Sequence, residues 1–337
     1  MKTACVLRWG AYGDMIMITP LLRKLNEDGY RVIVNTTHRG LPILKNNPFV
    51  SEIVEYKDNE IPHSKLKEYW DDISKKYDKF INLSGTIEGA LLKDTRKPEE
   101  CKGTKEELHR ECNRNYYDEM FRVEGYEDRG KNGELYFSRF EISRAKEYRK
   151  KYWDKFIMLW SLSGSALHKC YPYAEYVARA FLEKHEDAMT LTVGDDACMM
   201  LEWEHPQGKC YSGKWNIRHS LIMTKFADLV IGTETGILNA AGCFDTPKIV
   251  MLSHSSEENL TKYWKNCISL SADVKCYPCH KMHYELKTCE LDDKLKTPLC
   301  MAKLGPQYLF EAMENYYYKW REQEDIYKDR AKKLLFA

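Results

Sequence analysis

The chain has 337 residues, of which 43% are hydrophobic and 31% charged, as in an ordinary soluble globular protein of roughly two domains. Its 52 Lys and Arg residues against 51 Asp and Glu give a formal net charge of +1. This composition excludes large-scale disorder and a mainly electrostatic nucleic-acid binder, although it leaves room for a local basic groove.

The N-terminal region shows neither a membrane span nor an export signal. The mostly apolar run at 15–22 lies between Asp14 and Arg23 and is far shorter than the ~20 residues of a spanning helix. Arg8 interrupts the early apolar run before the core of a secretory signal can form. Twelve cysteines without an export signal are typical of a reducing compartment, so we expect a cytoplasmic protein.

The first part of the chain predicts a β-turn-α-β unit. Residues 4–7 form a short apolar run, a turn of small residues follows, and apolar side chains then recur at helical spacing over 18–25. A second strand is predicted at 31–34 and a third at 80–83. Such units imply a parallel sheet with right-handed crossovers. Charged helices are expected around 106–121 and 139–155.

The second part repeats this alternation. Strands are predicted at 156–160, 189–194, 228–232 and 248–252, with helices near 173–181 and 221–226 and from about 306 onward. The fold class is therefore α/β, with two Rossmann-like domains, at 1–150 and 151–315, facing each other across a cleft. The final helix is long enough to run back over the first domain at about 316–337.

Three turns follow predicted strands, at the edge where open α/β sheets bind ligands. The first contains Trp9, Gly10, Tyr12 and Gly13 and ends at Asp14. Its glycines allow a close approach of the backbone to a ligand. The carboxylate of Asp14 is either a functional group at a helix start or a simple helix cap, and spacing alone does not separate the two.

The other two turns suit an anion. Ser163, Gly164 and Ser165 precede Lys169, and hydroxyls, amides and an ammonium at a helix start suit a phosphate. In the third turn, Glu234 offers a carboxylate for sugar hydroxyls, while Thr235 and the amides of Gly236 and Ile237 offer donors for phosphate. A surface loop and a helix cap are the alternatives for these two turns.

Together these residues resemble the ADP-heptose:lipopolysaccharide heptosyltransferases, glycosyltransferase family 9. The segments that carry the resemblance are Gly13-Asp14 with Pro20, Leu21, Leu22 and Leu25; Asn47-Pro48-Phe49-Val50; Ser163-Gly164-Ser165 with Lys169 and Pro172; and 228–236 with Ala240, Ala241, Thr246 and Pro247. The resemblance implies a GT-B architecture, with the acceptor on the N-terminal domain and the nucleotide-sugar on the C-terminal domain. It also implies inversion at the anomeric carbon without a catalytic metal.

The resemblance assigns a role to each matched residue. Asp14 becomes the general base for the acceptor hydroxyl, and Glu234 holds donor hydroxyls. The donor and its diphosphate lie on Ser163, Gly164, Ser165, Lys169, Thr235, Gly236 and Asn239, and the acceptor-side loop comprises Trp9, Gly10, Tyr12 and Gly13. The family commonly has Asp where this chain has Glu234 and His where it has Asn239.

A cysteine cluster at 276–300 is independent of these motifs. Cys276, Cys279, Cys289 and Cys300 contain one tight Cys-x₂-Cys pair, which is half of a usual tetrahedral zinc site. A structural zinc, two disulfides and four unlinked thiols are the open interpretations, and a reducing compartment disfavours the disulfides. A catalytic zinc is not expected, because four thiolates leave no open coordination position.

We therefore predict an inverting, metal-independent glycosyltransferase that uses a nucleotide-diphosphate sugar and, in the first place, a carbohydrate-type acceptor. One alternative is transfer to a hydroxymethylated pyrimidine in DNA. Another is a non-catalytic nucleotide-sugar-binding or scaffold protein with a zinc-like module. The aromatic residues Tyr316, Tyr317, Tyr318 and Trp320, with Arg321, suit either helix packing or the stacking of nucleobases.

Overall fold

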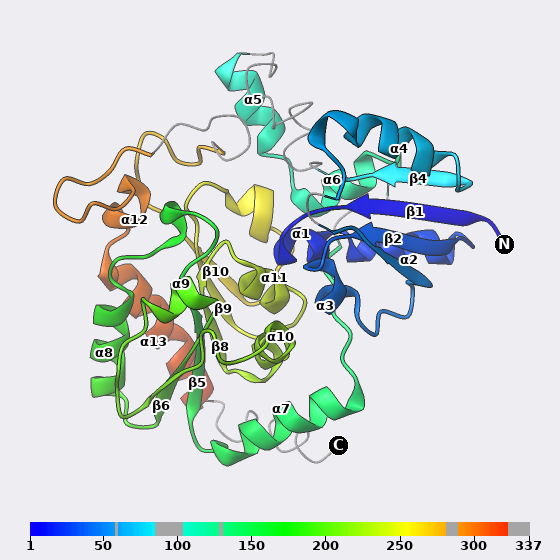
Figure 1. Ribbon diagram of the computed structural model, residues 1–337. Coiled ribbons are helices and arrows are strands. Elements are labelled where there is room, and N and C mark those ends of the chain that lie inside the picture. The colour runs from blue at the N-terminus through cyan, green and yellow to red at the C-terminus, as the bar shows by residue number, and fades with distance from the viewer. Residues whose placement is uncertain (58–59, 85–103, 128–130, 281–288, 323–337) are drawn as a thin grey trace. The chain divides into compact units, whose positions relative to one another are not determined.

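The structure is a computed structural model that describes residues 1–57, 60–84, 104–127, 131–280 and 289–322 (Figure 1). Its contacts divide the chain into two compact units. Unit 1 comprises 1–136, 258–263 and 279–287, and unit 2 comprises 137–257, 264–278 and 288–337.

Unit 1 is built on a parallel sheet of four strands in the order β3-β2-β1-β4. The strands are β1 (Thr3–Arg8), β2 (Arg31–Thr36), β3 (Glu52–Glu55) and β4 (Lys79–Asn82). Its helices are α1 (Tyr12–Met17), α2 (Thr19–Glu27), α3 (Gly40–Leu44), α4 (Leu66–Ser74), α5 (Lys105–Cys112) and α6 (Tyr116–Arg122). Cys5 of β1 lies opposite Ile33 of β2 and Phe80 of β4, so β1 is a central strand.

The opening β-turn-α-β unit is as predicted, with one difference in its helix. Residues Ala4–Leu7 are fully buried, as expected of a strand covered on both faces. The helix is divided into α1 and α2 at Ile18, where Pro20 stands in the first turn of the second helix. Gly29, with φ of 85°, reverses the chain toward β2, a conformation that other residues rarely adopt.

Unit 2 is built on a parallel sheet of six strands in the order β10-β9-β8-β5-β6-β7. The strands are β5 (Phe156–Ser161), β6 (Ala188–Val193), β7 (Gly208–Cys210), β8 (Leu229–Thr233), β9 (Lys248–Met251) and β10 (Cys267–Leu270). Its helices are α7 (Arg139–Lys151), α8 (Ala174–Lys184), α9 (Asp196–Met199), α10 (Ile217–Phe226), α11 (Gly236–Gly242), α12 (Leu299–Lys303) and α13 (Pro306–Glu322). Both sheets have the parallel, helix-covered arrangement predicted for Rossmann-like domains.

The described part of the final helix, Pro306–Glu322, packs on unit 2. In Figure 1, α13 lies beside α8, and its buried face joins the core of the same unit. Trp320 meets Phe156 with ring centroids 5.4 Å apart, and Tyr317 meets Phe181 at 5.7 Å. These rings are core residues, which overturns the interpretation as a surface for nucleobases; Tyr318, 46% exposed, is the exception. The part of the predicted helix at 323–337 lies outside the described ranges.

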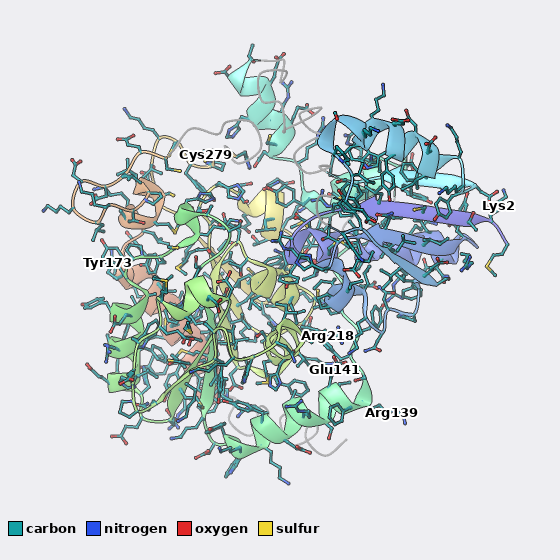
Figure 2. The ribbon with its side chains drawn as sticks, in the orientation of Figure 1. Lys2, Arg139, Glu141, Tyr173, Arg218 and Cys279 are labelled. Atoms are coloured by element: carbon teal, nitrogen blue, oxygen red, sulfur yellow. The ribbon has the colours of Figure 1, made fainter. Side chains whose placement is uncertain are left out.

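The division between the units falls earlier than the expected domain boundary at residue 150. Helix α7 belongs to unit 2 because Glu141 forms an ion pair with Arg218 of α10 (Figure 2), with an Nε–Oε1 distance of 2.7 Å. The Arg218 guanidinium, together with Ser138, lowers the pKa of Glu141 to about 2. Tyr148 of α7 also contacts unit 2, because its hydroxyl donates a hydrogen bond of 3.0 Å to the hydroxyl of Tyr211.

Other differences concern short elements. The single helix predicted at 106–121 is two helices, because Asn115 leaves helical geometry and its side chain caps α6. The sequence analysis did not predict the strands β3, β7 and β10. Each of them lies at a sheet edge and has partly exposed residues. Within the described ranges, no helix has the length and apolar character needed to cross a membrane.

Candidate active site

Asp14 lies in the first turn of α1, directly beyond the end of β1. Its Oδ2 accepts a hydrogen bond of 2.7 Å from the amide of Ala11, so the carboxylate does cap the helix. Its Oδ1 lies 3.0 Å from Nη2 of Arg8, and its side chain remains 21% exposed. A carboxylate has about four acceptor positions, so Asp14 keeps capacity for a further donor. Capping and a chemical role are therefore compatible.

The acceptor-side loop packs around Asp14 and an aromatic group. An added Cβ on Gly10 would come within 2.5 Å of the Asp14 Cβ, so only glycine fits at that position. Trp9 stacks on Tyr56 with ring centroids 3.8 Å apart, and its Nε1 donates to Oδ1 of Asn35 at 2.8 Å.

The remaining residues of that loop start the helix. Tyr12 is half-buried and is the first residue of α1, and Gly13 is buried behind it. The structure thus shows where the loop lies in unit 1, at the carboxyl end of its sheet, which is the ligand-binding edge in open α/β folds.

In unit 2, the loop after β5 brings Lys169 against the loop after β8. A Cβ on Gly164 would lie 2.6 Å from Cδ of Lys169 and 3.3 Å from Cγ2 of Thr235, so the bare glycine backbone lets the two loops meet. The Thr233 hydroxyl donates to the Lys169 carbonyl at 2.9 Å and fixes the loop from the other side. Three residues predicted for phosphate binding are therefore adjacent: Gly164, Lys169 and Thr235.

The two serines of the same loop differ from each other. Ser163 is half-buried, with its hydroxyl 3.2 Å from the Gly164 carbonyl and 3.0 Å from Sγ of Cys170. Ser165 is exposed, and its hydroxyl makes no hydrogen bond to another described residue, so it is available to solvent or ligand. The sequence placed both in one site without distinguishing them.

Lys169 is the cation at the point where the loops after β5 and β8 meet. Its side chain is only 9% exposed, yet within the described ranges its ammonium makes no hydrogen bond or ion pair. A buried ammonium is unfavourable unless an anion or a set of acceptors neutralises it. This arrangement suits a site that binds an anionic ligand at Lys169.

Glu234 has a different set of contacts from those that the sequence suggested. Its side chain is 6% exposed, and Oε1 accepts from the amides of Ser253, His254 and Ser255 at 2.7, 3.1 and 3.2 Å. Its Oε2 accepts from the Ser253 hydroxyl at 2.7 Å. Oε1 thus accepts three hydrogen bonds and Oε2 one, all from the loop after β9. A contact with sugar hydroxyls stays a prediction, and the observed role is to hold that loop.

Thr235 and Asn239 organise the start of α11. The Thr235 hydroxyl accepts from the amide of Leu238 at 3.4 Å and donates to the Ser161 hydroxyl at 3.2 Å. Asn239 donates to the Thr235 carbonyl at 2.9 Å, and Gly236 is the first residue of the helix. The helix-cap alternative is therefore observed, and it places these residues beside Lys169.

Two histidines, one from each of two loops of unit 2, contact each other, and the sequence analysis did not predict this pair. His168 and His254 meet edge to face with ring centroids 5.3 Å apart. Burial lowers the pKa of His168 below its usual value, while Glu234 raises it and Lys169 lowers it by smaller amounts. A neutral imidazole at pH 7 follows, which leaves Lys169 as the positive group. No spacing rule pairs residues 168 and 254, so only the fold reveals this contact.

Of the three open interpretations of the cysteine cluster, the structural zinc receives no support. Among the described residues, no three His, Cys, Asp or Glu side chains form a group that could hold a metal ion. Cys300 is buried in the hydrophobic core of unit 2, whereas Cys276 is exposed. No disulfide joins these cysteines in the part of the chain that the structure describes.

Comparisons with known proteins agree on the fold. A glycosyltransferase of family 9 from Veillonella parvula superposes with a TM-score of 0.69 at 13% identity, covering 94% of this chain and 98% of that one. Two similar structures come from E. coli. ADP-heptose lps heptosyltransferase II gives 0.63 at 13% identity over 95% and 99% of the chains, and WaaC with ADP-2-deoxy-2-fluoro heptose gives 0.57 at 11% over 93% and 99%.

These structures confirm the fold predicted from the sequence, a GT-B type with two Rossmann-like domains. No protein-family model matches the sequence, and no curated protein matches it significantly. At these identities the likeness establishes the fold, and the activity must be argued from the residues of the site.

Proposed function

We propose that this protein is an inverting glycosyltransferase that moves a sugar from a nucleotide-diphosphate sugar to an acceptor hydroxyl. The observation that carries the proposal is the buried side chain of Lys169, whose ammonium has no anionic partner in the described ranges and whose stem packs against Gly164, which in turn lies close to Thr235. A diphosphate leaving group supplies the missing negative charge. Glycosyltransferases of similar fold were solved with ADP and with an ADP-sugar, so ADP-sugars are the first donors to test.

The proposed reaction is a single displacement. The acceptor oxygen attacks the anomeric carbon, its proton passes to the Asp14 carboxylate, and the bond from that carbon to the diphosphate breaks. The electron pair of that bond goes to the diphosphate, where Lys169, the Ser165 hydroxyl and the Gly236 amide stabilise the charge. A positioned base contributes typically 10²–10⁴-fold, and donors set in advance stabilise the departing charge further.

Glu234 has a supporting role in this proposal. Because its oxygens accept four hydrogen bonds from Ser253–Ser255, it fixes the loop that carries His254 against His168. The donor sugar then meets a loop whose position depends on Glu234. Asn239, in the place where family 9 commonly has histidine, donates a hydrogen bond to the Thr235 carbonyl.

A carbohydrate-type acceptor is the first choice, and hydroxymethylated DNA is the alternative. The charge balance of +1 gives no support to a DNA groove. The scaffold alternative does not explain why a carboxylate with spare acceptor capacity and an unneutralised ammonium stand at the carboxyl ends of two parallel sheets. It also needs a zinc module, for which the described residues offer no site.

The test uses Asp14→Asn. Asparagine can still accept from the Ala11 amide but cannot take a proton, so we expect transfer from the accepted donor to fall by about 10²–10⁴-fold. Thermal stabilisation by the nucleotide-sugar should persist, since the phosphate loops are unchanged. Asp72→Asn, an exposed carboxylate on α4 of the same unit, is the matched control. Transfer that survives in Asp14→Asn would place the base elsewhere.

A further inference from the structure

Arg8 is a buried charge at the end of β1. Its side chain is 1% exposed, although the strand before it is a run of apolar residues in the core. A guanidinium in such a position is strongly unfavourable unless fixed partners surround it. The sequence analysis gave Arg8 no role other than to interrupt an apolar run.

Two partners tie Arg8 to separate parts of unit 1. Its Nη1 donates to the Leu83 carbonyl at 2.7 Å, and its Nη2 lies 3.0 Å from Oδ1 of Asp14. Leu83 is itself anchored, because its amide donates to the Leu7 carbonyl at 2.7 Å and continues the pairing of β4 with β1. The guanidinium therefore spans from a rigid strand end to the carboxylate.

The other sides of the Asp14 carboxylate are restrained as well. The Ala11 amide holds Oδ2, and the missing side chain of Gly10 leaves the space that Asp14 fills, since a Cβ there would lie 2.7 Å from Oδ2. Each oxygen thus has a fixed partner, and 21% of the side chain remains exposed for a third group. The carboxylate has one defined orientation before any acceptor arrives.

We infer that Arg8 is a positioning residue that fixes the orientation of the Asp14 carboxylate for proton transfer. This inference rests on the proposed function, in which Asp14 is the base. Arg8 is too deeply buried to touch the acceptor, so it acts through Asp14. Because a displacement of about 1 Å at a reacting group reduces rates by about 10²-fold, loss of Arg8 should reduce turnover and leave donor binding unchanged.

The experiment compares Arg8→Met and Arg8→Lys with the wild type. We expect Arg8→Met to lower kcat about 10²-fold with the donor KM unchanged. Arg8→Lys should recover part of the loss, since an ammonium supplies the charge but not the fork that reaches both partners. Arg31→Met, which removes an exposed arginine at the start of β2, controls for the loss of a cation and should keep full activity.

The double variant Arg8→Met with Asp14→Asn separates positioning from general damage. If Arg8 acts only through Asp14, the double variant is no slower than Asp14→Asn alone. A further loss in the double variant would overturn the inference, as would full activity in Arg8→Met. Should Arg8→Met fail to fold, Gly10→Ala displaces the same carboxylate by a different route, and normal kcat in that variant would also overturn it.

These outcomes are distinct from failure of the proposed function. An active Asp14→Asn variant removes the base assignment itself. An inactive Asp14→Asn beside a fully active Arg8→Met removes only the positioning role.

Discussion

Replacement of Lys169 by methionine should stabilise the free protein and abolish nucleotide binding. Methionine has a similar length and volume, so the stem packs against Gly164 as before and only the charge is removed. In the described structure that side chain is only 9% exposed and has no anionic partner. Removal of the charge therefore relieves an unfavourable burial in the free state and eliminates the group that binds the diphosphate.

The magnitude follows from the exposure of the side chain. Full burial of an ammonium costs several kcal/mol, and Lys169 is only 9% exposed, so we expect a gain of at least about 1 kcal/mol. In a unit of this size that corresponds to a rise in Tm of about 2–4 °C. A nucleotide at 100 times its wild-type Kd stabilises the wild type by about 2.7 kcal/mol, and the variant should lose nearly all of this.

Differential scanning fluorimetry with and without ADP measures both effects in one series. Lys225→Met, which removes a cation of α10 that lies 5.6 Å from the Phe244 ring centroid, is the control for a change of net charge. A lower Tm for free Lys169→Met would show that the ammonium is already well neutralised. An unchanged ADP shift would show that the diphosphate does not bind at this loop. Either result would refute the reasoning.

Two further predictions concern carboxylates of unit 2. Glu234→Gln keeps one oxygen for the three amides, but it removes the charge that strengthens these hydrogen bonds and puts an NH2 group opposite the Ser253 hydroxyl, so urea unfolding should show a loss of about 1–3 kcal/mol. Ser253→Ala should lose about 1 kcal/mol, because only one bond disappears. The Arg218 guanidinium holds the pKa of Glu141 at about 2 in the folded state, against 4.5 for an unperturbed glutamate. The stabilisation by this ion pair is therefore complete above pH 4.5 and is lost as the pH falls toward 2. Relative to Glu141→Gln, the wild type should thus lose about 1–2 kcal/mol more between about pH 6 and pH 3; equal losses would contradict the assignment.

Strands of the fold could be predicted where burial on both faces left an uninterrupted apolar run. β1, β5, β8 and β9 are of this kind, and each was expected within about two residues of its observed bounds. β7 has the sequence Gly-Lys-Cys and stands at a sheet edge, where one partner strand suffices and the residues need not be apolar. Its pairing with β6 depends on the tertiary structure, and no local sequence pattern predicts it.

The site was predictable to the extent that topology determines it. Parallel strands bring the turns at their carboxyl ends to one edge of the sheet, so the sequence predicts that Lys169 and Thr235 lie close together. Arg8 could not be assigned, because its partner Leu83 follows a strand whose pairing depends on the whole sheet. Local spacing also cannot show that a turn carboxylate such as Glu234 is bound by another loop.

The length of Glu234 gives a physical reason for one departure from the family 9 pattern. The carboxylate reaches three successive amides and a hydroxyl of the Ser253–Ser255 loop, all within 3.2 Å. An aspartate is one methylene shorter, so on the same backbone it would not reach all of these donors. In this chain Glu234 therefore fixes the loop after β9, including the backbone of His254, whose amide is one of the bound donors. The position of the loop beside His168 thus depends on Glu234 in this chain, which makes the donor sugar a property to be measured on this protein.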